Sequence, residues 1–201
     1  MAIIVILILV GTYYYLQRVS IRGAITKSLV KNVEDAKKPR AVSEASIPAS
    51  MEGNEYSINF WVYISDYVYR YEADKVIINR GNNPMIYLSK KTNNLVVYTE
   101  VAQKFVNEEG EDSSNECVVK NVPLQRWVNV NVTLNNNVVD IFFDAKLVKS
   151  CVLDGYSTPN KGSMNICPDG GYNGFISRVT FTNRALSLSE LTKMYKSGPG
   201  L

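Results

Sequence analysis

The sequence predicts an all-β protein: a two-sheet antiparallel jelly-roll sandwich with a short C-terminal helix, preceded by an N-terminal transmembrane helix. After about residue 50 the chain consists of short runs rich in β-branched and aromatic residues, and turn residues separate them. No long helical pattern lies between these runs, which argues against a parallel sheet with helical crossovers. The chain begins, in contrast, with one uncharged apolar run.

The apolar run covers residues 2–16 (AIIVILILVGTYYYL) and predicts a membrane anchor within segment 1–18. As a helix it would extend roughly 22 Å, less than the ~30 Å hydrocarbon core, and residues 17–21 could complete it. No basic segment precedes the run and no small-residue cleavage site follows it, which favours an anchor over a cleaved signal peptide. The residues expected to contact lipid are Ile3, Ile4, Val5, Ile6, Leu7, Ile8, Leu9, Val10, Tyr13, Tyr14, Tyr15 and Leu16.

Positive charges follow the anchor at once. Between residues 17 and 40 the chain has seven Lys and Arg residues but only Glu34 and Asp35 as acids. The positive-inside rule then places the following domain on the cytosolic side of a single-pass protein. The formal net charge of the whole chain is +3, so the remainder is nearly neutral. We therefore expect the lipid bilayer as a partner and no nucleic acid.

Residues 19–50 are interpreted as a basic juxtamembrane segment and linker. Apolar residues at three- and four-residue steps between Val19 and Val33 predict a short amphipathic helix near the membrane. From Glu34 to Ser50 the composition turns to Lys, Ala, Ser and Pro, which is typical of a linker. The boundary of the β domain, residues 51–201, is accordingly placed near Met51.

The β domain contains nine strand-like runs with alternating patterns. In the run that starts at Trp127, the valines at 128, 130 and 132 share one face with Leu134, and polar residues share the other. One face is therefore core. The predicted strands are Tyr56–Ile64, Lys75–Asn79, Met85–Leu88, Asn94–Thr99, Cys117–Lys120, Trp127–Leu134, Val138–Phe143, Lys146–Val152 and Gly174–Thr182.

A short helix is expected near the C-terminus. Ser187 and Glu190 have the spacing of a capping box, and Leu188, Leu191 and Tyr195 form an apolar stripe behind it. Gly198-Pro199 ends the segment.

Several segments resemble a known family. The run NVPLQRWVNVNV from Asn121, followed by VDIFFDAKLV from Val139, is similar to the core of concanavalin A-like (laminin G-like) sandwiches. The motifs CVVKNVPLQRWVNV, SCVLDG and PDGGYNGFIS more narrowly resemble membrane-anchored members from large icosahedral DNA viruses, notably those of algae. The resemblance covers roughly residues 54–199. One departure from the family pattern is Asp144-Ala145, at a hairpin where the family often has Asp-Gly. Ala adopts a positive φ less readily than Gly, so this hairpin could have another turn type.

Nothing in the sequence predicts an enzyme. The chain has no His, which removes the usual triads and His-metal sites. Glucanases on this fold place acids at alternating positions of one strand, and that pattern is missing. The acids between Glu108 and Asp112 are interpreted as a solvated loop. We expect no catalytic residues, no metal and no cofactor.

A ligand loop is a separate candidate. Residues 154–174 hold Asp and Asn side chains whose oxygens could bind a sugar or calcium, although these residue types also form ordinary turns. The candidate ligand residues are Asp154, Asn160, Asp169 and Asn173, with Tyr156 and Tyr172 beside them. Four further tyrosines could form an aromatic sugar platform: Tyr63, Tyr67, Tyr69 and Tyr71.

The three cysteines are Cys117, Cys151 and Cys167. A β-meander could bring Cys117 and Cys151 together and leave Cys167 free, but three cysteines permit three pairings. A cytosolic domain would ordinarily keep all of them reduced. The viral resemblance favours a disulfide, because such viruses commonly carry their own thiol oxidase.

Topology and resemblance together predict a non-enzymatic minor capsid protein. In a virion with an internal membrane, the shell is built on the cytosol-derived face, where the flanking charges place the β domain. The protein would link that membrane to the capsid proteins. The alternative is a membrane-displayed, lectin-like module that binds glycan.

Overall fold

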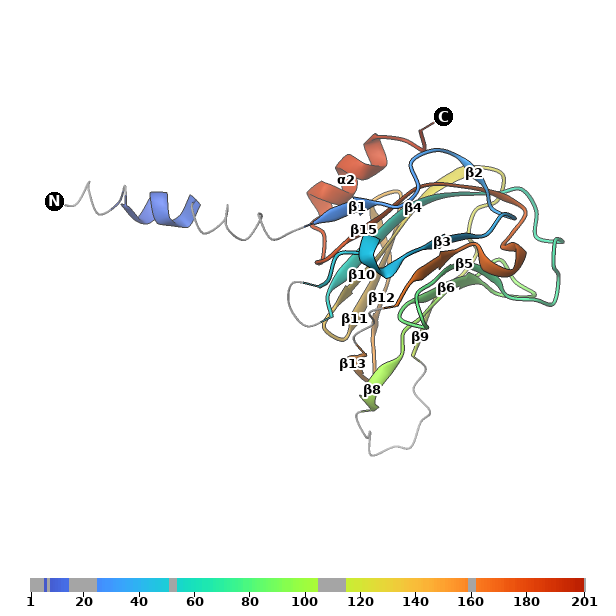
Figure 1. The fold of residues 1–201 in the computed structure, drawn as a ribbon, viewed down its shortest axis with the longest axis horizontal. Coiled ribbons are helices and arrows are strands. Elements are labelled where there is room, and N and C mark those ends of the chain that lie inside the picture. Colours follow the sequence, from blue (N-terminus) through green and yellow to red (C-terminus); the bar gives the residue numbers. More distant parts are fainter. Residues whose placement is uncertain are drawn as a thin grey trace.

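The computed structural model describes residues 6, 8–14, 25–50, 54–104, 115–158 and 162–200. Within these residues the chain forms an antiparallel sandwich of one seven-stranded and one six-stranded sheet, with a small two-stranded sheet beside them (Figure 1). The all-β, two-sheet prediction with a C-terminal helix is therefore confirmed.

The strands alternate between the two large sheets in a jelly-roll manner. The seven-stranded sheet runs β1 (Thr26–Ser28), β15 (Gly174–Thr182), β4 (Tyr56–Ile64), β10 (Trp127–Asn135), β11 (Val138–Phe143) and β12 (Lys146–Val152), with β2 (Glu34–Asp35) also paired to β15. The six-stranded sheet runs β3 (Arg40–Val42), β14 (Met164–Ile166), β5 (Lys75–Asn79), β6 (Met85–Leu88), β7 (Leu95–Tyr98) and β9 (Glu116–Val119). The small sheet pairs β13 (Gly155–Ser157) with β8 (Val101–Lys104). The helical segments after residue 25 are η1 (Glu44–Ser46), η2 (Pro168–Gly170) and α2 (Leu188–Lys196) among the described residues.

Alternation along the central strands creates the core. In β4, Ile58, Phe60 and Val62 are buried among the core residues, and in β10 the valines at 128, 130 and 132 meet them from the same sheet. A side chain every second residue faces the second sheet, so each central strand contributes one apolar row. The single-face pattern predicted for β10 is thus confirmed.

The opposite, outer face of the seven-stranded sheet is polar and is partly covered by α2. Ser57 and Thr133 share a hydrogen bond of 3.0 Å, and Asn59 and Asn129 exchange amide hydrogen bonds of 3.0 and 3.2 Å. Trp61 stacks on Tyr195 of α2 with ring centroids 5.8 Å apart. Polar rows on this face can therefore be buried because their side chains bond to one another.

The predicted capping box starts α2 as expected. The Ser187 side chain accepts from the backbone N–H of Glu190, and the Glu190 carboxylate accepts from the backbone N–H of Ser187. Arg184 adds an ion pair to Glu190 at 2.5 Å. The carboxylate therefore fixes both the helix start and the loop before it.

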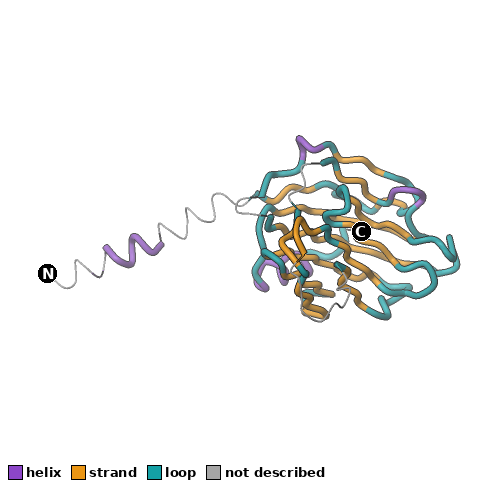
Figure 2. Tube along the Cα trace, turned by 90° about the horizontal axis from the view of Figure 1, so that it is seen from below, coloured by secondary structure: helices purple, strands orange, loops and turns teal. Residues whose placement is uncertain are grey.

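The two ends of the seven-stranded sheet differ. The chain enters the sheet at Ile25, whose N–H donates to the Asn183 side chain at 2.8 Å. We call this end, where Ser57 of β4 pairs with Thr182 of β15, the entry end. The other end, at Ile64 and Gly174, is the loop end. Seven residue steps along β4 lead from Ser57 to Ile64, which places the two ends about 23 Å apart. Figure 2 shows loops, drawn in teal, at both ends of the strands.

The linker prediction does not hold for residues 26–42. Residues 26–28 are strand β1 rather than part of an amphipathic helix, and β1, β2 and β3 hydrogen-bond to β15 or β14. Leu29 and Val30 are buried in the core. The apolar spacing reflects contact of an edge segment with the core, so the domain begins before residue 51. Residues 19–24 and 51–53 lie outside the described residues.

The anchor prediction is only partly covered by the structure. Residues 8–14 are helical. Within the described part of the chain, no helix combines the length and apolar character needed to cross a bilayer. The anchor residues Ile6, Ile8, Leu9, Val10, Tyr13 and Tyr14 are exposed. The others, Ile3, Ile4, Val5, Leu7, Tyr15 and Leu16, lie outside the described residues.

Candidate functional site

The predicted ligand loop does not form one site. Asp154 follows Leu153, whose N–H donates to Asn137 O at the entry end, where Tyr56 of β4 pairs with Leu134. Asp169 and Asn173 lie at the loop end, since Asn173 O accepts from Ser65 N–H at 2.8 Å. Asn160 lies outside the described residues. The structure therefore places Asp154 and Asn173 at opposite ends of the sheet, so these candidate residues do not share a site.

Asn173 has a structural role at the loop end. Its amide donates to Asp66, which also accepts from the backbone N–H groups of Tyr69 and Val68. These hydrogen bonds, with that from Tyr69 the largest influence, lower the pKa of Asp66. Tyr172 is fully buried and donates to Phe175 O. Among the described residues, no three acidic or cysteine side chains are grouped as metal ligands would be.

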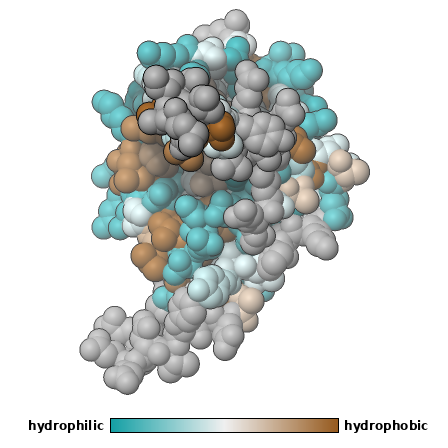
Figure 3. Space-filling model, turned by 90° about the vertical axis from the view of Figure 1, so that its left-hand side faces the viewer, coloured by the Kyte–Doolittle hydropathy of each residue, from teal (hydrophilic) through white to brown (hydrophobic). Residues whose placement is uncertain are grey.

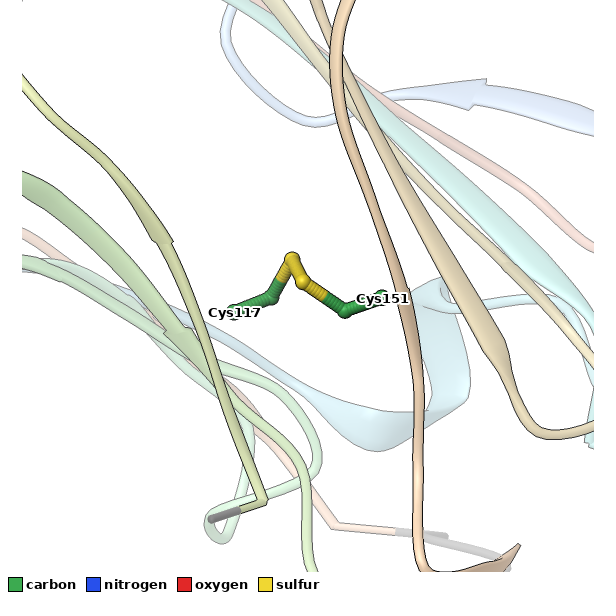
Figure 4. Close-up of a disulfide and its surroundings, with 2 residues drawn as sticks. All are labelled: Cys117 and Cys151. Carbon is green, nitrogen blue, oxygen red and sulfur yellow. A yellow bond between two sulfur atoms is a disulfide. The ribbon is translucent and has the colours of Figure 1, made fainter.

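The structure joins Cys117 to Cys151 and leaves Cys167 as a buried free thiol (Figure 4). The pairing does not come from a β-meander within one sheet. Cys117 lies on β9 and Cys151 on β12, and these are the outermost strands of the two different sheets. The disulfide therefore links the sheets at one edge of the sandwich.

An aromatic cluster lies on the outer face at the loop end. It consists of Tyr63, Trp127 and Phe175, with ring centroids 5.7 Å apart for Tyr63 and Trp127 and 6.2 Å apart for Tyr63 and Phe175. With Val33 these rings line an open cavity of about 330 Å³. Phe175 is 43% exposed. Adjacent rings on three paired strands give a large apolar surface at little entropic cost, which is typical of contact sites.

The cluster follows from strand register. Trp127 pairs with Tyr63, and Tyr63 pairs with Phe175 on the other side. All three are at outward positions of β10, β4 and β15, in line with the alternation that sends their neighbours into the core. The three rings therefore form one apolar patch at the loop end. Figure 3, which shows the side from which the N-terminal helix projects, has apolar groups among polar ones.

A second hollow, called the amide-lined hollow after its three asparagines, lies at the same end. It encloses about 540 Å³ and its lining residues are Tyr67, Lys91, Thr92, Asn93, Asn94, Lys120, Asn121 and Leu124. Hydrogen bonds shape it: the Asn93 amide donates to Val122 O, and Asn121 N–H donates to Asn94 Oδ1. The Tyr67 hydroxyl donates to Ser89 O and Thr92 O, and burial raises the pKa of Tyr67. Below it, the Lys75 ammonium lies 4.4 Å from the Tyr67 ring centroid.

Several non-glycine residues at the loop end have a strained backbone. Asn121, Gln125, Asp144 and Ala145 all have positive φ angles, from 50° to 61°. Gln125 N–H donates to Ile64 O at 2.7 Å, which fixes the loop that separates the hollow from the cluster. Strained non-glycine residues persist only where their surroundings hold them, and they concentrate at functional sites.

The Asp144-Ala145 turn explains the departure from Asp-Gly. Both residues have positive φ, as in a type I′ hairpin, so the turn type is kept although Ala replaces Gly. Asp144 holds the turn in place: its carboxylate accepts from Asn129 N–H at 2.9 Å and pairs with Arg126 at 3.2 Å.

A family model described as the concanavalin A-like lectin/glucanases superfamily matches residues 40–192, which is most of the chain. The chain belongs to this superfamily. A comparison with curated proteins found no match.

Solved structures support the same fold. The binding domain of botulinum neurotoxin serotype D/C is 16% identical, with a TM-score of 0.59, and the match covers 87% of this chain and 47% of that chain. The serotype G binding domain is 16% identical, with a TM-score of 0.56 and coverages of 87% and 46%. The serotype D ligand binding domain in complex with N-acetylneuraminic acid is 13% identical, with a TM-score of 0.61 and coverages of 87% and 46%. The chain thus spans about half the length of these neighbours, and the likeness shows the fold alone.

Membership in the concanavalin A-like superfamily does not reveal which residues bind. Of the tyrosines predicted as a platform, Tyr63 joins the aromatic cluster and Tyr67 lines the hollow. Tyr69 donates to Gly170 O, and Tyr71 is exposed. Sequence analysis missed Trp127 and Phe175 as site residues because it treated their strands only as core. The available signal was strand alternation. Trp127 directly precedes Val128, which faces the core, so the Trp127 side chain is expected to face outward.

Proposed function

We propose that this protein is a membrane-anchored, non-enzymatic structural protein of a virion. In this proposal residues 1–18 hold it in an internal membrane, and the β domain faces the capsid shell and contacts capsid protein. The apolar run and the cationic segment after it support the anchor and its orientation. The resemblance to membrane-anchored viral members of the family supports the setting.

The observation that carries the proposal is the position of the aromatic cluster. The described domain begins at the entry end, and the cluster lies at the loop end of the same sheet, about 23 Å away. A protein that links a membrane to a shell needs its contact surface away from its point of attachment. Trp, Tyr and Phe are enriched at such contacts, and the Phe175 side chain is exposed here.

Fractionation of purified virions tests this function. The protein should be present in intact virions, and cross-linking should join it to capsid protein. Trp127→Ala and Phe175→Ala should reduce the cross-linked product at least about tenfold. Leu147→Ala is the matched control, because Leu147 is 55% exposed on β12 and lies outside the cluster. Virions and membrane-free capsids that both lack the protein would rule out a structural role.

A second candidate is glycan binding, and the amide-lined hollow favours it. Asn93, Asn94 and Asn121 can donate and accept hydrogen bonds with sugar hydroxyls, and Tyr67 offers an aromatic wall. One structural neighbour, the serotype D ligand binding domain, was solved in complex with N-acetylneuraminic acid.

A glycan array with the detergent-solubilised full chain separates the two candidates. Saturable binding of a defined sugar that Asn121→Ala weakens, but Trp127→Ala does not, would assign the hollow to glycan and contradict a purely structural role. Binding to no sugar, together with the cross-link to capsid protein, would leave the structural function alone.

A further inference from the structure

A third pocket lies on the outer face of the seven-stranded sheet, between β1, β15 and α2. Its volume is about 290 Å³. Ser28 of β1 and Thr180 of β15 pair directly across its side, Trp61 of β4 lines it, and Met194 of α2 borders it. The pocket shares no lining residue with the aromatic cluster or the amide-lined hollow. A ligand in this pocket would therefore contact none of the residues that line the other two sites.

The charge of this pocket is one-sided. Lys31 and Arg178 line it, and no acidic residue does. Three other arginines of the domain pair with carboxylates: Arg40 with Glu34, Arg126 with Asp144 and Arg184 with Glu190. Among the described residues, neither Lys31 nor Arg178 forms an ion pair of this kind. Two unneutralised cations that share one pocket favour an anionic ligand.

Arg178 is held in position by the C-terminal segment. It lies in the irregular part of β15 between Ser177 and Thr180 and has a φ of 47°. One guanidinium nitrogen donates to Ser197 O at 3.0 Å, and the Ser177 hydroxyl donates to Pro199 O at 2.6 Å. A Cβ atom on Gly200 would lie 2.6 Å from Arg178 Nε, so the segment packs closely on the guanidinium.

These contacts orient the Arg178 side chain but use only part of its hydrogen-bonding capacity. A guanidinium has five N–H donors in a planar fork, and only one nitrogen is engaged by Ser197. An arginine that is already ordered loses little entropy when it binds. The Ser28 and Thr180 hydroxyls lie in the same pocket and can also donate.

We propose that this pocket binds a phosphate group. Arg178 supplies forked charge-assisted hydrogen bonds, Lys31 supplies a second positive charge, and the hydroxyls contact the remaining oxygens. The small volume fits a single compact anion with a short substituent rather than an extended chain. The phosphate can come from a soluble ester or from a lipid headgroup, and the chemistry of recognition is the same.

Tryptophan fluorescence of the full chain in a nonionic detergent tests the proposal. The chain has two Trp residues, so a Trp127→Phe background leaves Trp61 in the pocket as the only one. Inorganic phosphate should change its emission saturably, relative to chloride at equal ionic strength. Arg178→Gln and Lys31→Gln should each weaken binding about tenfold. Lys27→Gln is the control, because Lys27 lies on β1 but does not line the pocket.

Mixed micelles distinguish the two sources. Phosphatidic acid carries a phosphate monoester, and phosphatidylcholine serves as its control lipid. Saturation by inorganic phosphate supports the proposal with a soluble ligand, and a response to phosphatidic acid alone supports it with a lipid. No saturable response in either arm, or a response that both pocket variants leave unchanged, overturns it. Circular dichroism before each titration shows that Arg178→Gln is folded, and Lys31→Gln replaces it as the deciding variant if it is not.

Discussion

The entry end and the loop end of the seven-stranded sheet are built in opposite ways. At the entry end, Ile25 bonds to Asn183, the Leu186 N–H donates to Ser57, and the capping box starts α2. At the loop end, the Phe175 ring is exposed beside the half-buried Tyr63, and the hairpin residues Asp144 and Ala145 adopt positive φ. At the entry end these side chains hydrogen-bond to the backbone, and at the loop end apolar surface is left open.

The difference teaches how one sandwich can combine stability with recognition. The hydrogen bonds and the disulfide near the entry end stabilise the fold whether or not a partner is bound. The strained turns and open rings at the loop end do the reverse, because they cost stability in the isolated domain. Substitutions at the two ends should therefore separate into those that change unfolding and those that change binding.

The largest expected effect is loss of the disulfide. Cys151 pairs with Val139, close to the turn at the entry end, and the bridge to Cys117 closes a loop with a sequence separation of 34. The double substitution Cys117→Ser and Cys151→Ser should lower the free energy of unfolding by about 3 to 4 kcal/mol, because the unfolded chain regains that loop entropy. Urea denaturation measures the change.

Reduction of the unmodified chain provides the control for this prediction. Dithiothreitol should lower its stability to that of the double variant, and it should leave the variant unchanged. Equal stability of the oxidised chain and the variant would show that the entry end does not depend on the bridge. Cys167 should stay unreactive to alkylation in the folded chain, since burial raises its pKa to about 12.

The next largest expected effect on stability is loss of the Glu190 carboxylate. The hydrogen bond from Arg184, followed by the bonds to Ser187, lowers the pKa of Glu190 from 4.5 to about 2. A carboxyl with a lowered pKa stabilises the fold above its unfolded pKa, and this contribution is lost as the pH falls from about 4.5 towards 2. After allowance for solvent screening of this partly exposed pair, we expect about 1 to 2 kcal/mol.

Thermal unfolding between pH 2 and 7 measures this contribution. The Glu190→Gln variant should lose stability at neutral pH and should show a smaller decrease on acidification than the unmodified chain. An identical pH dependence in both proteins would contradict the assignment to Glu190.

At the loop end, one substitution is expected to increase the free energy of unfolding rather than lower it. Ala145 has a φ of 61°, a conformation that glycine adopts more readily, so Ala145→Gly should raise the free energy of unfolding by about 1 kcal/mol. The matched variant Ala102→Gly, in strand β8 where φ is not positive, should lower stability instead. Destabilisation by Ala145→Gly would mean that the strain assigned to this turn is absent.

The smallest effect on stability is expected at Phe175. Its ring is partly exposed, so Phe175→Ala should cost about 1 kcal/mol or less while it removes one side of the aromatic cluster. Binding of the partner should fall far more than stability. Parallel denaturation and cross-linking measurements check this, and a loss of stability as large as that of the disulfide variant would place Phe175 among the core residues.

Most of the fold was accessible from the sequence because the central strands carry strong alternation. β4, β5, β6, β11, β12 and β15 have the predicted bounds, and β7, β9 and β10 differ by one residue at one or both ends. The strands that sequence analysis missed are short, such as β1 and β14. Three residues cannot display a period of two, and their pairing depends on partners far along the chain.

The binding surfaces were less accessible for a related reason. The composition of residues 154–174 suggested a single ligand loop, but Asp154 and Asn173 end up at opposite ends of a sheet. Local composition cannot show this, because register between distant strands decides which loops meet. Conversely, Trp127 and Phe175 are separated by 48 positions, and only their common partner Tyr63 brings them together.

The position of β1 determines how the domain would bear a mechanical load. A pull on the chain before Ile25 would act on β1, which is held at the edge of its sheet by three residue pairs with β15. The bonds from Leu29 and Val30 to Val179 O would be loaded next. The disulfide lies at the opposite edge, on β12, and outside this path. Resistance to force and resistance to reduction are therefore separate properties of this domain.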